Sequence, residues 1–219
     1  MMLKDYSVVV LGAGGVGKTS MVVQFIHGFF TQEYNPTIED CYRHLVQLPD
    51  GYYHTVEILD TAGTHQFPAM RELSIRSGHA FVIVYSIESE ESFREAMKIA
   101  DMVNNIKGRG KVPMVLVGNK SDLNQNREVD MDRARQLSVD SLECAHLETS
   151  AKYGLNINSL FTELLSAAMH IVSKDHIGAT IKKGIIIPRM RSKLKRLASD
   201  SVVHVATSPQ ARNQKCTIL

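Results

Sequence analysis

The sequence is poor in cysteine, with only three in 219 residues. This odd and sparse set does not provide a disulfide framework, so we expect a reducing compartment. The sequence also lacks the run of about 18 apolar residues that a membrane-spanning helix requires. Its first apolar stretch, residues 8–11, is too short for a secretory signal and leads directly into a glycine-rich loop. We therefore expect neither a disulfide-stabilised secreted domain nor an integral membrane protein.

Charge is unevenly distributed along the chain. From His170 onward there are ten basic and two acidic residues, so this part carries a charge of +8. The whole chain carries +2, which leaves −6 on residues 1–169. An acidic body with a basic tail predicts that the tail contacts an anionic partner, either a membrane surface or a nucleic acid.

Short apolar runs alternate with helical patterns along the first three-quarters of the chain. Continuous apolar runs are typical of strands that are buried on both faces, and apolar residues three and four positions apart are typical of helices. The continuous apolar runs predict strands at residues 8–11, 81–85 and 114–117. The spacing of apolar residues predicts helices at residues 93–103 and 157–168.

A different pattern surrounds the turn signal Pro49-Asp50-Gly51. It joins residues 42–48 to residues 52–59, which predicts an antiparallel hairpin. Together, the patterns predict an α/β fold with a mostly parallel sheet, helices on both faces and one antiparallel edge. Periodicity fades after Val172, so we expect a domain over residues 1–172 and a flexible basic tail over residues 173–219.

Residues 12–19 read G-A-G-G-V-G-K-T and match the phosphate-loop pattern between a predicted strand and a predicted helix. In that context the backbone N–H groups and the helix N-terminus favour phosphate. We expect Lys18 to reach the β- and γ-phosphates and Thr19 to ligate Mg²⁺. The alternative is a glycine-rich turn with a surface lysine. The expected phosphate-binding residues are Gly14, Gly15, Val16, Gly17, Lys18, Thr19 and Ser20.

Residues 119–122 read N-K-S-D and follow another predicted strand. The Asp122 carboxylate can accept hydrogen bonds from N1–H and the exocyclic amine of guanine, a donor pair that adenine lacks. Residues 148–152, E-T-S-A-K, fit as the second side of a base pocket, or alternatively as an ordinary strand-to-helix turn. The expected base-pocket residues are Asn119, Lys120, Asp122, Ser150, Ala151 and Lys152.

With these motifs, residues 4–172 resemble the Ras family of small GTPases. The matching segments are G-A-G-G-V-G-K-T, Y-N-P-T-I-E-D-C-Y, D-T-A-G, N-K-S-D and E-T-S-A-K. The resemblance implies a P-loop NTPase fold with six strands, GTP/GDP and Mg²⁺ as ligands, and hydrolysis of GTP to GDP and phosphate. The stretches D-T-A-G-T-H-Q-F and P-A-M-R-E-L-S-I are similar to the Rap and Di-Ras branches.

The resemblance also implies roles for individual residues. Phe30 is expected to stack on guanine, and Tyr34 and Thr37 to belong to the first switch loop. Gly63 is expected to bond the γ-phosphate through its N–H group and so order the second switch loop. The implied Mg²⁺ ligands are Thr19, Thr37 and Asp60, and the implied catalytic residues are Lys18, Thr37, Gly63 and Thr64.

Residues 34–42 resemble the family's effector-binding segment, which implies an effector with a Ras-binding-like domain. Ile38 lies between a proline turn and two acids, and it is suited to pairing with the edge of a partner's sheet. The alternative is an exposed strand entry with no partner. The segment consists of Tyr34, Asn35, Pro36, Thr37, Ile38, Glu39, Asp40, Cys41 and Tyr42.

Thr64 follows D-T-A-G, where the family carries a glutamine that orients the attacking water. Threonine is shorter, has no amide and is stiff, so we expect slow intrinsic hydrolysis. The resemblance to Rap implies an activating protein that supplies an asparagine in trans, besides an exchange factor for nucleotide release. The alternative is a protein that is GTP-bound by default, with negligible hydrolysis.

The chain ends in Cys216-Thr217-Ile218-Leu219, a match to the prenylation pattern, and the last leucine favours geranylgeranyl. One lipid chain needs a second signal, which the basic cluster over residues 182–196 can supply. No aromatic residues alternate with these charges, so nucleic acid is the poorer partner. We therefore expect lipidation at Cys216 and a position on the cytoplasmic face of a membrane, the plasma membrane being favoured.

These observations predict a membrane-anchored GTP/GDP switch in signalling. Two other classes stay open: a GTP-loaded binding module without useful catalysis, and a P-loop kinase for a small molecule. The N-K-S-D motif argues against the kinase.

Overall fold

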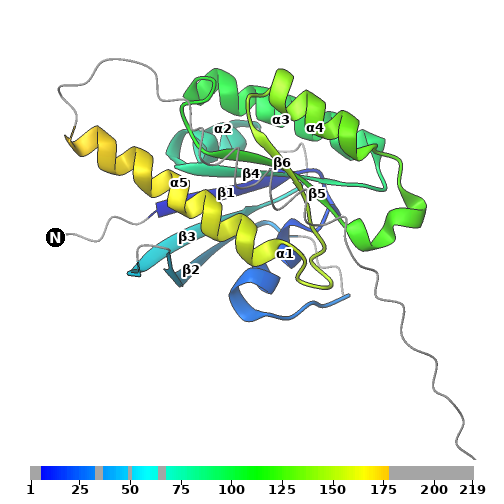
Figure 1. Ribbon diagram of the computed structural model, residues 1–219, viewed down its shortest axis with the longest axis horizontal. Helices are drawn as coiled ribbons and strands as arrows, with labels where there is room; N and C mark the ends of the chain where they lie inside the picture. The colour runs from blue at the N-terminus through cyan, green and yellow to red at the C-terminus, as the bar shows by residue number, and fades with distance from the viewer. Residues whose placement is uncertain (1–5, 33–36, 49–50, 64–67, 178–219) are drawn as a thin grey trace, which may run out of the picture.

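A computed structural model of the chain describes residues 6–32, 37–48, 51–63 and 68–177. The described residues form one six-stranded sheet with the order β2-β3-β1-β4-β5-β6 (Figure 1). The pair β2–β3 is antiparallel and all other neighbouring pairs are parallel, which confirms the predicted fold class. The strands are β1 (Tyr6–Gly12), β2 (Glu39–Gln47), β3 (Tyr53–Thr61), β4 (Ala80–Ser86), β5 (Met114–Asn119) and β6 (Ala145–Glu148).

Helices cover both faces of the sheet (Figure 1). Helices α1 and α5 pack on one face, and α2, α3 and α4 pack on the other. Among the described residues, no helix is both long enough and apolar enough to cross a membrane. The helices are α1 (Lys18–His27), α2 (Pro68–Ser77), α3 (Glu90–Lys107), α4 (Met131–Asp140) and α5 (Ile157–Ile177), with a 3₁₀ segment η1 (Ser121–Asn126).

The central strands are buried on both faces, as their continuous apolar runs predict. In β1, Val8 and Val10 pack toward α1 and α5, whereas Val9 and Leu11 pack toward α2 and α3. Successive side chains of a strand point to opposite faces, so a strand with helices on both sides needs apolar residues at every position.

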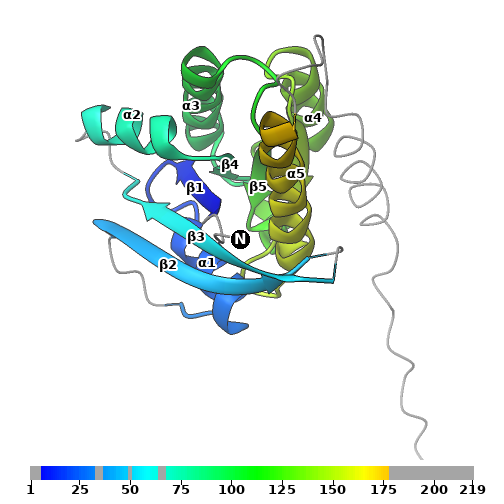
Figure 2. The same ribbon diagram turned by 90° about the vertical axis from the view of Figure 1, so that its left-hand side faces the viewer.

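The predicted hairpin is formed by β2 and β3, with the register running from Glu39 opposite Thr61 to Gln47 opposite Tyr53. Figure 2 shows this hairpin at the edge of the sheet, with β2 outermost. Pro49 and Asp50 of the turn lie outside the described residues. Gly51 has φ of 84° and donates its N–H to the carbonyl of Leu48, so the turn requires glycine there.

Helix α5 continues to Ile177, past the predicted domain boundary at residue 172. Residues 178–219 lie outside the described residues. The boundary between a folded domain and a basic tail therefore stays a prediction.

Candidate nucleotide-binding site

The phosphate-loop motif joins the end of β1 to the start of α1, as predicted. The cap of α1 is Gly17, which has φ of 93° and no side chain to satisfy the first N–H groups of the helix. A Cβ atom at residue 17 would lie 2.4 Å from the Asn119 amide nitrogen, so the close approach of two loops also requires glycine. Free N–H groups at a helix N-terminus form a phosphate site.

Lys18 is buried beneath this loop. Its Nζ donates to the carbonyl of Gly12 at 3.0 Å and to that of Ala13 at 2.7 Å. Burial lowers the pKa of Lys18 to about 8, although the charges of Asp60 and Glu95 oppose this effect. An ammonium has three donors. Two of them fix the lysine against the loop, and the third is available to a phosphate.

The three predicted Mg²⁺ ligands lie together in the structure. The Thr19 hydroxyl donates to Asp60 Oδ2 at 2.5 Å and lies 2.8 Å from the Thr37 hydroxyl. Asp60 is fully buried, and its Oδ1 has no hydrogen-bond partner among the described residues. Burial raises the pKa of Asp60 to about 6, and the Thr19 hydrogen bond and Lys18 counteract the rise.

This donor set fits Mg²⁺ held jointly with phosphate. Mg²⁺ typically binds one or two carboxylates and completes its octahedral coordination with phosphate oxygens and water. A buried carboxylate oxygen without a partner is suited to such a shell, directly or through water. In the described ranges, no group of three His, Cys, Asp or Glu residues could hold a metal without such help. Thr19, Thr37 and Asp60 would therefore hold the ion, which would neutralise phosphate charge.

The described part of the second switch loop lies directly against the phosphate loop. A Cβ atom at Gly63 would come within 2.3 Å of Gly14 Cα, so only glycine permits this contact. The preceding Thr61 is anchored by its hydroxyl, which donates to the carbonyl of Val10 at 2.8 Å. Gly63 is thus next to the predicted phosphate site, and Thr64 lies outside the described residues.

Asn119 connects the two halves of the predicted nucleotide site. Its Nδ2 donates to the Val16 carbonyl at 2.9 Å. Its Oδ1 accepts from the Thr149 hydroxyl and from Ala151 N–H, both at 3.2 Å. The buried amide is therefore used to join the phosphate loop to the end of β6.

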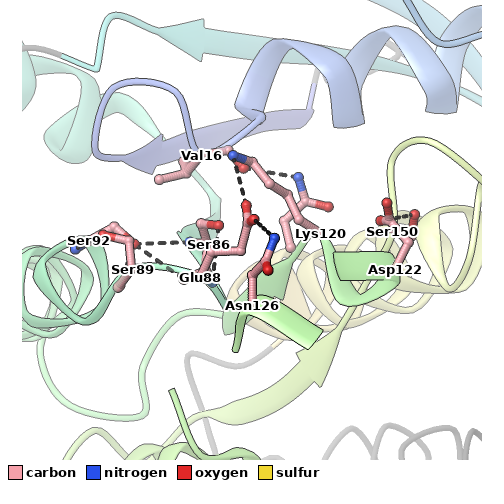
Figure 3. Close-up of polar contacts among 10 residues, drawn as sticks. Val16, Ser86, Glu88, Ser89, Ser92, Lys120, Asp122, Asn126 and Ser150 are labelled. Carbon is pink, nitrogen blue, oxygen red and sulfur yellow. Dashed lines mark hydrogen bonds and ion pairs between the residues drawn. The ribbon is translucent and has the colours of Figure 1, made fainter. Parts of the chain in front are cut away.

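Ser150 holds Asp122, the residue predicted to recognise the base. The Ser150 hydroxyl donates to Asp122 Oδ1 at 2.6 Å, on the right of Figure 3. This bond orients the carboxylate through Oδ1. Ala151 is buried beside this pair, whereas Lys152 is exposed and its Nζ lies 5.2 Å from the centre of the Tyr153 ring.

Phe30 is half-buried and packs against the core formed with α1 and α5. Its predicted stacking on guanine stays a prediction. Of the predicted site residues, Tyr34, Asn35, Pro36, Thr64 and Cys216 lie outside the described residues.

The described part of the predicted effector segment leads into the edge strand β2. Ile38 is 87% exposed, the largest value among the large apolar residues that the structure describes. Thr37, beside it, contacts Thr19 at the predicted metal site. The structure thus places an exposed apolar residue next to a predicted Mg²⁺ ligand.

Sequence analysis missed two residues, Glu88 and Arg127, that contact residues of the predicted base pocket. Glu88 contacts Lys120, and Arg127 pairs with Glu148 through two hydrogen bonds. No short motif marks Glu88 or Arg127. One signal was available for Glu88, because ligand sites of parallel sheets gather where the strands end, and Glu88 follows the end of β4.

A family model described as the Ras family matches residues 7–170, about three-quarters of the chain. Proteins of this family bind GTP and GDP with Mg²⁺, hydrolyse GTP and interact with exchange factors, activating proteins and effectors. The match agrees with the six-stranded sheet and with the phosphate-loop and base-pocket motifs at its edge. The chain therefore belongs to the Ras family of small GTPases.

Proposed function

We propose that this protein is a membrane-anchored signalling switch that presents its β2 edge to an effector when GTP is bound. The observation that carries the proposal is the 2.8 Å contact between the hydroxyls of Thr19 and Thr37. Thr37 directly precedes Ile38 and the edge strand, so the position of this surface is linked to occupation of the metal site. A γ-phosphate that draws Thr37 toward Mg²⁺ would order the surface, and hydrolysis would release it.

The partner that suits this surface is a domain with an exposed sheet edge. Strand β2 is outermost in the sheet, and among the described residues no strand pairs with its outer edge, which suits pairing with a partner's strand. Ile38 supplies an apolar contact, and Glu39 and Asp40 supply negative charge. We therefore propose an effector with a Ras-binding-like domain and a basic edge.

We further propose that GTP hydrolysis is slow without help, because Thr64 stands where the family carries a glutamine. Phosphoryl transfer depends mainly on positioning and charge stabilisation, so loss of the residue that orients water slows it. An activating protein of the Rap type, which supplies an asparagine in trans, is the favoured activator. The second candidate function is a GTP-bound module with negligible hydrolysis, which the same threonine favours.

The test is single-turnover GTP hydrolysis by wild type and Thr64→Gln. Each protein is measured alone, with a Rap-type activating domain and with a Ras-type domain. We expect Thr64→Gln to raise the basal rate of hydrolysis. We expect the Rap-type domain, but not the Ras-type domain, to accelerate hydrolysis by wild type by about 10³–10⁵. Acceleration by neither domain, with a basal rate restored by Thr64→Gln, would favour the default GTP-bound module. Competition by ATP as effective as that by GTP would contradict the guanine specificity assigned to Asp122.

The proposed membrane anchor is a prenyl group on Cys216, assisted by the basic residues between 182 and 196. The experiment is flotation of the prenylated protein with vesicles that contain anionic lipid. We expect Cys216→Ser to abolish flotation, and neutral vesicles or high salt to weaken it. Flotation of Cys216→Ser at the wild-type level would contradict the proposal.

A further inference from the structure

The turn between β4 and α3, residues 86–89, lies against the base-recognition loop, residues 119–122. Ile87 N–H donates to the Asn119 carbonyl at 3.1 Å. On its other side, the Ile87 carbonyl accepts from Glu128 N–H at 2.9 Å and from Val129 N–H at 3.1 Å. The backbone of the turn is thus fixed between the base-recognition loop and the segment before α4.

Hydrogen bonds within the turn fix the position of Glu88. Its N–H donates to the Ser86 hydroxyl at 3.3 Å, and Ser89 N–H donates to the Ser86 carbonyl at 3.1 Å. Ser89 then caps α3 by accepting from Ser92 N–H. The positive end of the helix favours a carboxylate at this place. The Glu88 side chain therefore extends from an ordered turn.

The Glu88 carboxylate joins two residues of the base-recognition region (Figure 3). Its Oε2 lies 3.5 Å from Lys120 Nζ, and its Oε1 accepts from Asn126 Nδ2 at 3.3 Å. These two partners lie at the start and the end of η1, whose loop also carries Asp122.

Lys120 itself is in an uncommon backbone conformation, with φ of 66°. A lysine side chain has four rotatable torsions, so a fixed partner is needed to hold its ammonium in one place. Glu88 is the acid that the structure pairs with it, and the two side chains are 23% and 35% exposed.

We infer that Glu88 is a positioning residue that holds Lys120 in the base pocket and so slows nucleotide dissociation. The inference rests on the guanine-nucleotide binding proposed above. Loss of the Glu88 charge would allow the Lys120 side chain to move out of the base pocket. The pocket would then bind the base less tightly. Lys120 belongs to the motif assigned to the base, which GDP and GTP share. Both nucleotides would therefore dissociate faster, and hydrolysis of bound GTP would not change.

The experiment uses the full chain loaded with a fluorescent GDP analogue in Mg²⁺, chased with unlabelled GDP. The variant Glu88→Gln keeps the shape of the side chain and removes its charge. The matched control is Glu91→Gln, an exposed acid in the first turn of α3. We expect dissociation about threefold faster for Glu88→Gln, as befits a partly exposed ion pair, and unchanged for Glu91→Gln.

A second comparison separates positioning from a general structural effect. In a Lys120→Met background, Glu88→Gln should produce no further acceleration, since its partner is absent. The inference is overturned if Glu88→Gln dissociates like wild type, or if its effect persists in the Lys120→Met background. Wild type that does not bind the GDP analogue would instead overturn the proposed function, and this inference with it.

Discussion

Tyr85 and His146 form a buried polar pair on the strands below the base-recognition loop. Tyr85 Oη lies 2.8 Å from His146 Nε2, and both side chains are buried. Burial, with contributions from Arg135 and Arg127, lowers the pKa of His146 to about 3. The histidine is therefore neutral in the folded protein near neutral pH, and it contributes a hydrogen bond without a charge.

This pair predicts a loss of stability in mild acid. The unfolded chain takes up a proton at His146 near pH 6.5, whereas the folded chain does not until about pH 3, so stability falls as pH falls between these values. For the GDP-bound protein at saturating GDP, we expect urea unfolding to show a decrease between pH 7 and pH 5. The decrease should be about 2 kcal/mol smaller in His146→Gln, which cannot titrate. An equal decrease in both proteins would contradict the assignment.

Individual site residues were predictable to different extents. Lys18, Thr19 and Asp122 stand in motifs whose chemistry follows from residue type and spacing. The place of Glu88 after a predicted strand could mark it as a site residue, but its contact with Lys120 depends on how β4 and β5 lie side by side and needed the structure. The use of the Asn119 amide for protein contacts also required the structure.

At the scale of elements, Arg127 connects η1 to the end of β6. Its two terminal nitrogens donate to the Glu148 carboxylate at 2.6 and 2.8 Å, and its Nε donates to Asn124 Oδ1 at 2.7 Å. The Arg127 and Glu148 side chains are only 23% and 13% exposed. The hydrogen bonds to Glu148 raise the pKa of Arg127, in keeping with a stable pair.

Removal of this connection should destabilise the fold. We expect Arg127→Met to lower the free energy of unfolding by about 2 kcal/mol, less than for a fully buried pair because some solvent reaches it. The control is Arg133→Met, since Arg133 pairs with Glu90 through two similar hydrogen bonds but is more exposed. Denaturant unfolding at fixed GDP concentration measures both. A loss in Arg133→Met as large as in Arg127→Met would argue against the importance of burial.

Helices and strands with strong apolar patterns were predicted from the sequence, whereas polar helices and short strands were not. The runs in β1, β4 and β5, the β2–β3 hairpin, and the stripes of α3 and α5 all appear in the structure. In contrast, β6 has only four residues, and α4 buries only Ala134 and Ser138. Asp130 caps α4 by accepting from Arg133 N–H at 2.8 Å, a start signal that the sequence does contain.

At the scale of the whole molecule, ligand binding and folding are coupled. The predicted Mg²⁺ site contains a fully buried carboxylate, and the phosphate loop covers a buried ammonium. Nucleotide and metal that bind only the folded chain stabilise it in proportion to the logarithm of ligand concentration.

Removal of Mg²⁺ and nucleotide should therefore lower the melting temperature. Ligand at about a thousand times its dissociation constant contributes about 4 kcal/mol. For a chain of this size, we expect EDTA followed by removal of GDP to lower Tm by about 8–16 °C. Differential scanning calorimetry before and after the treatment measures the change, and readdition of Mg²⁺ and GDP should reverse it. An unchanged Tm would show that the site contributes little to stability.

The nucleotide site gathers residues from widely separated parts of the chain. The phosphate loop is among the first described segments, whereas the segment after β6, which bonds to Asn119 and Asp122, is among the last. A ribosome therefore completes the phosphate loop long before the base pocket. The predicted base pocket can be complete only after residue 151 has been added and β6 has paired with β5. A message truncated before that point would yield a protein with a phosphate loop and no complete base pocket.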